Sequence, residues 1–566
     1  MAQQDTVFWF VAPDVAASHG DNPIYLRIST LGNPATITVK MPSTPSFAPI
    51  NINIPANNTG SINLTPYKGL IENTPANTVL DAGLLITSTS LVTAYYEVAH
   101  ANNPDIFPLK GKNGLGKEFF IPSQFHYPNQ VGQETFEIVA TENGTIVTIH
   151  VTDNVNGHAS GSTWSVNLKK GQTYSVRSTN ITASGTLSGS WVTSNKPIAV
   201  TIMDDSVRPQ PTGGYDLIGD QIQPVNILGI EYIVVKGFAF NASINFERFY
   251  VLAPYDNTQI FLNGSATPTA TLNSGQSHSV LMTDNAYYIV TDKPVYVYHI
   301  SGHFDELGSA VVPHITCTGS QQVGFNRTSN LDFALMLLTK NDYKAGFKVN
   351  GNATTILSTD FTSVPGTGGV WVYARKELNS TALLPTGSNV IENNLGPFHV
   401  GILNKLGGSS EYGYFSDYSS LYLGPDISFC FGTTVTLDAG ADYTSYLWNT
   451  GSINQTIQTA DTGSFYVTVQ DGLCILSDTV HLSYYPIPEV EIGNDTALCQ
   501  GESITFNTGA GFSSYLWHNG SSNQTLTTGT SGTKWIIVKD DNNCEASDTL
   551  QLIIHPVPSV LSIKHN

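Results

Sequence analysis

Acidic side chains cluster in one stretch of the chain and are the first candidates for chemistry. Asp204 and Asp205 are adjacent, and Asp216 and Asp220 follow shortly after them, on segments that we expect to be loops. Carboxylate oxygens are preferred ligands of calcium, and paired acids can also hydrolyse a glycoside. The plainer interpretation is that all four are solvated loop acids or turn caps. We keep them as weak calcium candidates and expect no other cofactor.

Histidines and known motifs give little further chemistry. His299, His303 and His314 are near one another in the sequence, but a metal site would need them on one face, which a strand–loop–strand segment does not provide. The chain has no His-Glu-x-x-His, no Gly-x-Ser-x-Gly and no phosphate-binding glycine loop. "SGSTW" (160–164) lacks the aspartate of a sialidase Asp box. We predict no catalytic residues and keep an unrecognised glycan hydrolase as an alternative.

The C-terminal part of the chain contains two copies of one unit. "SYLWNTGSINQT" (445–456) is repeated as "SYLWHNGSSNQT" (514–525), within units of about 70 residues. Apolar and polar residues alternate in short runs between Gly, Asn and Asp, which is typical of small antiparallel β-sandwiches. We predict domains at 421–490 and 491–566, the second with a short tail. Trp448 and Trp517 are interpreted as buried core residues and not as sugar-stacking platforms.

The cysteines follow the same repeat. One cysteine opens each unit and another lies near its end, so we predict the disulfides Cys430–Cys474 and Cys499–Cys544, with four buried thiols as the alternative. Such bridges indicate an oxidising compartment. Cys317 has no evident partner and is expected to be a buried thiol. The absence of a Cys-x-x-Cys pair leaves a zinc ribbon unsupported.

Residues 1–420 contain a longer and weaker repeat of about 90–110 residues. "ETFEIVATENGTIVTIH" (134–150) and "GSWVTSNKPIAVTIMD" (189–204) correspond to "ERFYVLAPYDNTQIFLN" (247–263) and "AYYIVTDKPVYVYHIS" (286–301). A weaker copy lies before them, and a divergent fourth copy is expected from residue 306. Each unit reads as about seven short strands. We therefore predict an all-β head. It is either a closed ring of propeller blades, which we favour slightly, or a set of tandem sandwiches.

Composition excludes several classes of protein. A chain of 566 residues exceeds a single core. The net charge of −20 would repel nucleic acid, and no apolar run is long enough for a membrane span. No signal peptide is evident, so we expect that a leader was removed and Met1 added. The abrupt ending suggests a parent protein that continues beyond residue 566.

Two family resemblances are specific. "SYLWNTGSINQTI" with "GSFYVTVQDGLC" resembles the Ig-like, PKD-type repeats of large secreted proteins from Bacteroidetes, which are typically exported by the type IX system and act as spacers. "YDLIGDQIQPVNILGIEYIVV" (215–235), "ELGSAVVPHITCTGSQQVGFNR" (306–327) and "FTSVPGTGGVWVYAR" (361–375) resemble the IgGFc-binding protein N-terminal domain family over most of 1–420. That resemblance implies an extracellular binding or adhesion module, and it brings no binding residues with it.

These observations predict a non-catalytic, secreted or cell-surface bacterial adhesin. Its head would bind a glycan, a glycoprotein or another surface polymer, and the two C-terminal domains would be spacers. A structural subunit of an extracellular filament or sheath, which self-associates, is the first alternative, and the glycan hydrolase is the second. No nucleic acid and no membrane span are expected.

Overall fold

A computed structural model describes residues 4–209, 214–241, 244–416, 421, 423–424, 426–441, 443–471 and 474–559 of the chain. The fold is all-β, as predicted, and divides into two compact units, Met1–Ser420 and Leu421–Asn566. We call the first unit the head. Within the described ranges, no helix is both long and apolar enough to cross a membrane.

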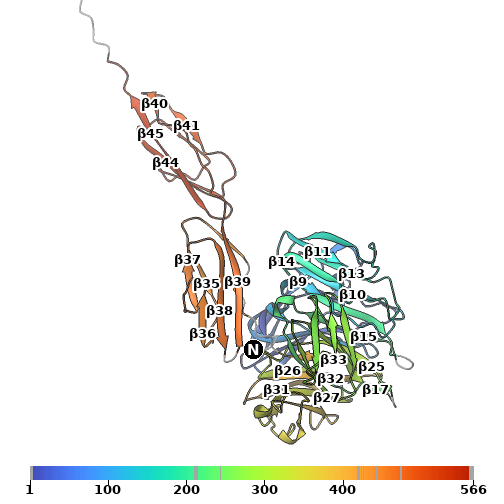
Figure 1. The fold of residues 1–566 in the computed structure, drawn as a ribbon. Helices are drawn as coiled ribbons and strands as arrows, with labels where there is room; N and C mark the ends of the chain where they lie inside the picture. Colours follow the sequence, from blue (N-terminus) through green and yellow to red (C-terminus); the bar gives the residue numbers. More distant parts are fainter. Residues whose placement is uncertain are drawn as a thin grey trace, which may run out of the picture. The chain divides into compact units, whose positions relative to one another are not determined.

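The head consists of four successive modules (Figure 1). The first contains β1 (Asp5–Phe10), β2 (Ile24–Thr30), β3 (Ala35–Lys40), β4 (Ile50–Ile54), β5 (Thr59–Asn63), β7 (Leu84–Val98) and β8 (Asp105–Pro108). The second contains β9 (Gly116–Phe120), β10 (Glu134–Ala140), β11 (Thr145–His150), β12 (Thr163–Leu168), β13 (Thr173–Arg177), β14 (Trp191–Val207) and β15 (Asp216–Ile222). The third contains β16 (Glu231–Val235), β19 (Arg248–Leu252), β20 (Thr258–Leu262), β21 (Ala270–Leu272), β22 (Ser277–Leu281), β23 (Ala286–Thr291), β24 (Tyr296–His303) and β25 (Glu306–Val312). The fourth contains β26 (Gln322–Arg327), β27 (Phe333–Lys340), β28 (Phe347–Val349), β29 (Thr362–Ser363), β30 (Trp371–Glu377), β31 (Gly387–Asn393), β32 (Phe398–Leu406) and β33 (Ser409–Phe415).

Short elements connect these strands. They are η1 (Thr65–Tyr67), α1 (Lys68–Ile71), β6 (Val79–Leu80), η2 (Gly111–Gly114), η3 (Val225–Ile227), the hairpin β17 (Phe240–Asn241) and β18 (Ile244–Asn245), η4 (Asn341–Tyr343) and η5 (Ser358–Asp360).

All four modules share one antiparallel topology. In the second module, the long strand β14 pairs through its first half with β9 and β11 and through its second half with β10 and β15. The long strand β7 does the same in the first module. In the third and fourth modules this strand is divided, into β23 and β24 and into β31 and β32. Each module is therefore a β-sandwich whose two sheets share one long or divided strand.

Local sequence explains why the modules match. The turn before β13 and the turn before β22 both contain Gly-Gln, with Gly171 and Gly275 at φ +81° and +79°, values that glycine adopts at little cost. The Gln172 side chain accepts a hydrogen bond from the amide of Lys169 (2.9 Å), and Gln276 accepts one from Asn273 (2.8 Å). The same residues build the same turn in both modules.

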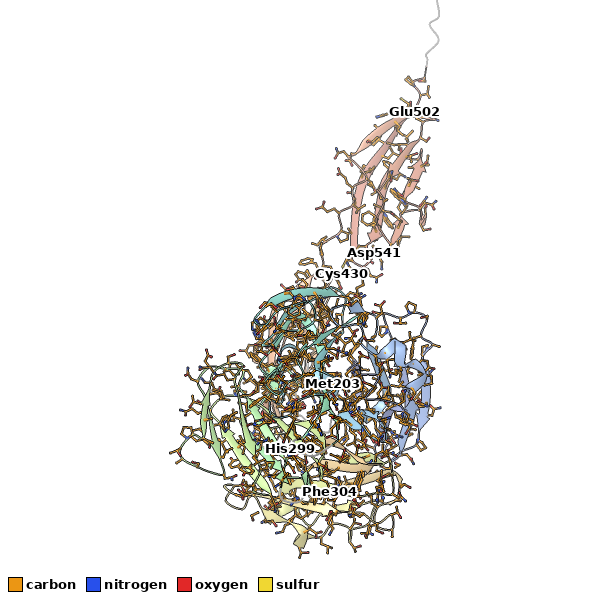
Figure 2. The ribbon with its side chains drawn as sticks, turned by 90° about the vertical axis from the view of Figure 1, so that its right-hand side faces the viewer. Met203, His299, Phe304, Cys430, Glu502 and Asp541 are labelled. Atoms are coloured by element: carbon orange, nitrogen blue, oxygen red, sulfur yellow. A yellow bond between two sulfur atoms is a disulfide. The ribbon has the colours of Figure 1, made fainter. Side chains whose placement is uncertain are left out.

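The four modules close into a ring. The last strands of the modules, β8, β15, β25 and β33, contact one another in cyclic order around the centre, and Figure 1 shows β15, β25 and β33 together. Hydrogen bonds join neighbouring modules, from the amide of Phe120 to the Tyr296 hydroxyl (3.4 Å) and from the amide of Thr59 to Ser388 Oγ (2.9 Å). The second of these bonds links the first module to the fourth. Side chains fill this interior, where Figure 2 labels the buried Met203 and His299.

Two predictions about the head are corrected. The described sheets form tandem sandwiches arranged in a ring, so the favoured propeller was wrong and the alternative holds. The segment from residue 306, assigned to the fourth copy, is β25, the last strand of the third module, because it pairs with β24.

The second unit consists of two repeats with the same strand order. The first has β34 (Ile427–Phe429), β35 (Val435–Asp438), β36 (Ser445–Trp448), β37 (Thr456–Thr459), β38 (Gly463–Asp471) and β39 (Cys474–Tyr484). The second has β40 (Thr496–Cys499), β41 (Ile504–Asn507), β42 (Ser514–Trp517), β43 (Thr525–Thr528), β44 (Gly532–Lys539) and β45 (Glu545–His555). Each repeat packs a four-stranded sheet on a two-stranded sheet.

The repeated Trp and Asn hold each of these repeats together. Trp448 and Trp517 are buried in the two separate cores. The Trp448 indole N–H donates to the carbonyl of Asn454 (2.8 Å), and that of Trp517 donates to the carbonyl of Asn523 (2.8 Å). Their interpretation as core residues is thus confirmed.

The disulfide pattern differs from the prediction. Cys430 bonds to Cys544, 114 residues away, and joins the two repeats, while Cys499 is free and exposed. The side chain of Cys474 lies outside the described residues. Cys317 is disulfide-bonded, so the expected free thiol was also wrong.

Strand geometry explains the correction. Phe429, next to Cys430, pairs with Tyr484 at the end of β39, whereas Cys474 begins that strand. Ten residues of extended strand separate two positions by roughly 33 Å, and a disulfide needs Cα atoms about 4.4–6.8 Å apart. In the second repeat, Cys499 pairs with His555 at the end of β45, and Cys544 precedes the start of that strand.

Candidate functional site

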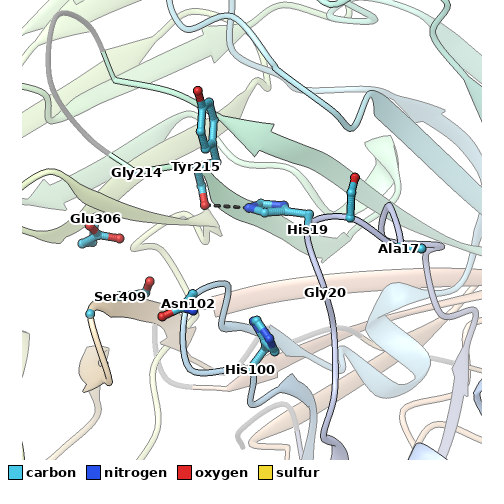
Figure 3. A pocket seen from close by; sticks show the side chains of 11 residues that line it. Ala17, His19, Gly20, His100, Asn102, Gly214, Tyr215, Glu306 and Ser409 are labelled. Atoms are coloured by element: carbon cyan, nitrogen blue, oxygen red, sulfur yellow. Dashed lines mark hydrogen bonds between the residues drawn. The ribbon is translucent and has the colours of Figure 1, made fainter.

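A polar pocket of about 560 Å³ opens near the starts of β8, β15, β25 and β33, the last strands of the four modules (Figure 3). All four modules contribute to its lining: Ala17, Ser18, His19, Gly20, His100 and Asn102 come from the first, Gly214 and Tyr215 from the second, Glu306 from the third, and Gly408 and Ser409 from the fourth. We call it the axial pocket. It exists only because the modules form a ring.

His19 is fixed in the wall of this pocket. Its Nδ1 hydrogen-bonds to a carboxylate oxygen of Asp205, and its Nε2 lies 2.7 Å from the carbonyl oxygen of Tyr215, as Figure 3 shows. Burial opposes a charged ring, but the hydrogen bond and charge of Asp205 and the carbonyl of Tyr215 outweigh it and raise the pKa of His19. Both ring nitrogens are thus occupied. The adjacent Ser18 and the Asp205–His19 pair therefore do not form a Ser-His-Asp triad, which needs a free Nε2.

Glu306 lines the pocket and is paired with the buried Asp216 behind it. Burial, reinforced by the neighbouring Glu306, raises the pKa of Asp216 well above its ordinary value. The pKa of Glu306 is raised by burial, although hydrogen bonds from Asp216 and Ser409 oppose the shift. The two carboxyl groups are hydrogen-bonded to each other, and burial is the main cause of both shifts. Glu306 is the one acid among the described lining residues.

The four calcium candidates lie on strands and not on loops. Asp204 and Asp205 are in β14, Asp216 and Asp220 are in β15, and all four are buried. Asp204 accepts from the amides of Gln124 (2.8 Å) and Asn129, and Asp220 binds Lys110 Nζ (3.0 Å) and the amide of Val311 (2.9 Å). Each acid is held by a different protein partner. The expected solvated loop acids were wrong, because these strands enter the ring interior.

Two of the three candidate histidines, His299 and His303, bind different protein partners. His299 Nδ1 lies 3.0 Å from the Tyr412 hydroxyl and Nε2 lies 3.1 Å from Glu247 Oε1, in the core of the head. His303 Nδ1 lies 3.2 Å from Ser410 Oγ. Across the part of the chain that the structure describes, no three His, Cys, Asp or Glu residues form a group that could hold a metal ion.

The sequence did not reveal the axial pocket. Its residues are spread from position 17 to position 409 and meet only through ring closure. A partial signal exists, because the last strands of all four modules carry an acid at or near their start, namely Asp105, Asp216, Glu306 and Glu411.

The head is thus an all-β ring of four sandwiches around a polar pocket. The sequence profile of the family described as IgGFc binding protein matches residues 106–403, from β8 to β32, which is more than half of the chain. The chain belongs to this family.

Other comparisons add little. No curated protein matches the sequence. Among solved structures, a chimeric titin Z1Z2 tandem is 13% identical over 24% of this chain and 97% of its own, with a TM-score of 0.12. The insect immune protein hemolin is 10% identical over 57% of this chain and 100% of its own, with a TM-score of 0.16. Extracellular domains 3–5 of Drosophila OTK are 8% identical over 42% of this chain and 92% of their own, with a TM-score of 0.15. Scores this low carry no argument.

Proposed function

We propose that the chain is an extracellular, non-catalytic binding protein of the adhesin type. Its head takes a hydroxyl-rich group of a glycan or glycoprotein in the axial pocket, and its two C-terminal repeats are spacers. The family membership supports a binding role, and the Cys430–Cys544 disulfide supports an oxidising, extracellular compartment.

The observation that carries the proposal is the axial pocket. Its volume of about 560 Å³ lies within the range of small-molecule sites. Asn102, Ser409 and Glu306 offer donors and acceptors of the kind that bind sugar hydroxyls, and the buried Nδ1 of His100 makes no hydrogen bond to described protein atoms. A ligand group that both donates and accepts would satisfy this nitrogen.

The pocket is less suited to a hydrolase. Glycosidases place two carboxyl groups about 5–9 Å apart on either side of the scissile bond. Here Asp216 is buried and hydrogen-bonded directly to Glu306, so these two carboxyl groups do not flank a space for a scissile bond. We therefore propose binding in preference to hydrolysis.

A glycan and glycoprotein array with the full chain tests this function, and IgG Fc is one of its glycoproteins. Gly408→Trp fills the pocket: a Cβ at Gly408 meets no atom within 4 Å and the residue needs no positive φ. We expect at least about tenfold weaker binding, or about 1.4 kcal/mol. Gly32→Trp, at an equally open glycine in the turn between β2 and β3 that does not line the pocket, is the matched control. Absence of all binding, with concentration-dependent assembly in light scattering, would instead favour a filament subunit.

A further inference from the structure

A second cavity of about 360 Å³ lies between the third and fourth modules of the head. Its lining residues are Phe238, His303, Phe304, Asp332, Arg375 and Glu377, none of which lines the axial pocket. We call it the Phe304 cavity. Two aromatic rings and four polar side chains in one small cavity are the composition of a ligand site.

Phe304 occupies an unusual backbone position. It is the first residue of the two-residue turn between β24 and β25, since His303 pairs with Glu306. Its φ is +57°, a value that glycine or asparagine normally takes in such turns and that is strained for a bulky residue. The side chain is nevertheless 49% exposed; Figure 2 labels it. Strained residues of this kind concentrate at functional sites.

Two buried nitrogen atoms of the lining residues make no hydrogen bond to described protein atoms. His303 is 3% exposed, and its Nε2 has no such partner while its Nδ1 is held by Ser410. Burial lowers the pKa of His303 to about 4, so the ring is neutral at physiological pH. Arg375 Nε is likewise unpaired, although its terminal nitrogens bond to Asn285 and to the carbonyl of Gly237. A buried polar group without a partner destabilises the fold, and a ligand hydroxyl would supply the missing hydrogen bond.

The charges around the Phe304 cavity are balanced. The Arg375 guanidinium lies 4.4 Å from the Phe238 ring centroid, and Lys405 Nζ lies 5.1 Å from that of Phe304. Lys405 is also 3.7 Å from Asp332 Oδ2. Two cations thus offset the acids Asp332 and Glu377, and each cation lies over one face of an aromatic ring. A charged ligand gains little there, whereas a neutral ligand with an apolar face and several hydroxyls matches the rings and polar groups.

We propose that the Phe304 cavity is a second binding site, for a neutral sugar ring. The ring's C–H face packs on Phe304, and its hydroxyls bond to His303, Arg375 and the two acids. This proposal goes beyond the axial pocket and does not depend on it.

The test is saturation-transfer NMR on the full chain with glucose, galactose, mannose, fucose and N-acetylglucosamine. At least one sugar should show transfer, and Phe304→Gly should weaken its binding at least about tenfold. Because glycine relieves the backbone strain, the melting temperature of this variant should stay the same or rise. Glu377→Gln, at an exposed acid of the lining, should weaken binding without unfolding the head.

Controls separate this site from the axial pocket. Tyr255→Ala removes another exposed aromatic side chain of the third module and should leave binding unchanged. Gly408→Trp should also leave it unchanged. Absence of transfer for every sugar, a signal that survives Phe304→Gly, or a lower melting temperature of Phe304→Gly would overturn the proposal. A signal that is lost only in Gly408→Trp would belong to the axial pocket and would also overturn it.

Discussion

At the scale of single residues, the head contains many buried carboxyl groups. Glu137 on β10 is fully buried and accepts hydrogen bonds from Asn73 Nδ2 (2.7 Å) and Ser175 Oγ (3.0 Å). Burial raises its pKa to about 7 and outweighs the opposing charge of Arg177 and these donors. The folded chain therefore binds this proton more tightly than the unfolded chain does.

This difference predicts a pH-dependent stability. A raised carboxyl pKa stabilises the folded chain below the unfolded value of about 4.5, and the stabilisation is lost as pH rises to about 7. Glu137→Gln cannot titrate, so the stability of the variant relative to wild type should rise between pH 4.5 and 7, by about 3 kcal/mol. Denaturant unfolding of the full chain at several pH values measures it.

The control for the change in charge is Glu118→Gln, on an exposed carboxyl of β9. A stability difference between Glu137→Gln and wild type that stays constant with pH would contradict the raised pKa.

At the scale of elements, the sequence predicted what depends on neighbours along the chain. The repeat of "ETFEIVATENGTIVTIH" as "ERFYVLAPYDNTQIFLN" predicted matching strands, and these are β10 and β11 in one module and β19 and β20 in the next. The acids of β14 and β15 were wrongly interpreted as loop residues. In the sequence, a buried acid within a strand looks like a loop residue until its distant donors, such as Lys110, are known.

The doubled "SYLW…NQT" segments give a prediction for one element. Trp448→Phe keeps an aromatic ring in the core but leaves the carbonyl of Asn454 without its donor. We expect a loss of about 1–3 kcal/mol in the first repeat. Trp448→Ala also removes the packing and should cost about 3–5 kcal/mol. Calorimetry of the full chain measures both.

Phe431→Ala, at a side chain that is 68% exposed, is the control and should change stability by less than about 0.5 kcal/mol. Equal effects of Trp448→Phe and Trp448→Ala would show that the hydrogen bond and not the packing determines stability.

The ring centre depends on a close approach between two elements. A Cβ at Gly308 on β25 would lie 2.6 Å from Tyr412 Cβ and 2.8 Å from its backbone nitrogen on β33. Gly308→Ala should therefore destabilise the head by about 1–3 kcal/mol, visible as a lower melting temperature. Gly32→Ala, where a Cβ meets nothing within 4 Å, should have little effect. Similar melting temperatures for the two variants would argue against the tight contact of β25 with β33.

At the scale of the whole molecule, long-range contacts decided what the sequence could not. A propeller and a ring of sandwiches have similar local patterns, and the difference lies in whether β14 pairs with two sheets. The axial pocket has the same origin, since Ser409 and His19 meet only when the ring closes.

The disulfide also predicts a property of the second unit. Peptide mapping of the unreduced chain should recover Cys430 linked to Cys544, and a thiol reagent should label Cys499 without reduction. Cys544→Ser should destabilise this unit by about 4–5 kcal/mol in the chain-entropy model. Recovery of a Cys430–Cys474 peptide would contradict the pairing.

The same bond determines how the chain would carry a pulling force. Tension applied between the head and the C-terminal end passes through β34 to Cys430 and crosses the sulfur bridge directly to Cys544. Residues 431–543, which include Trp448 and Trp517, then lie outside the stretched path, whereas Phe429 of the first core and Leu550 and Leu552 of the second core stay in it. While the bridge is intact, force cannot extend the segment between the two cysteines, so reduction would release residues 431–543 and let the tether lengthen under load.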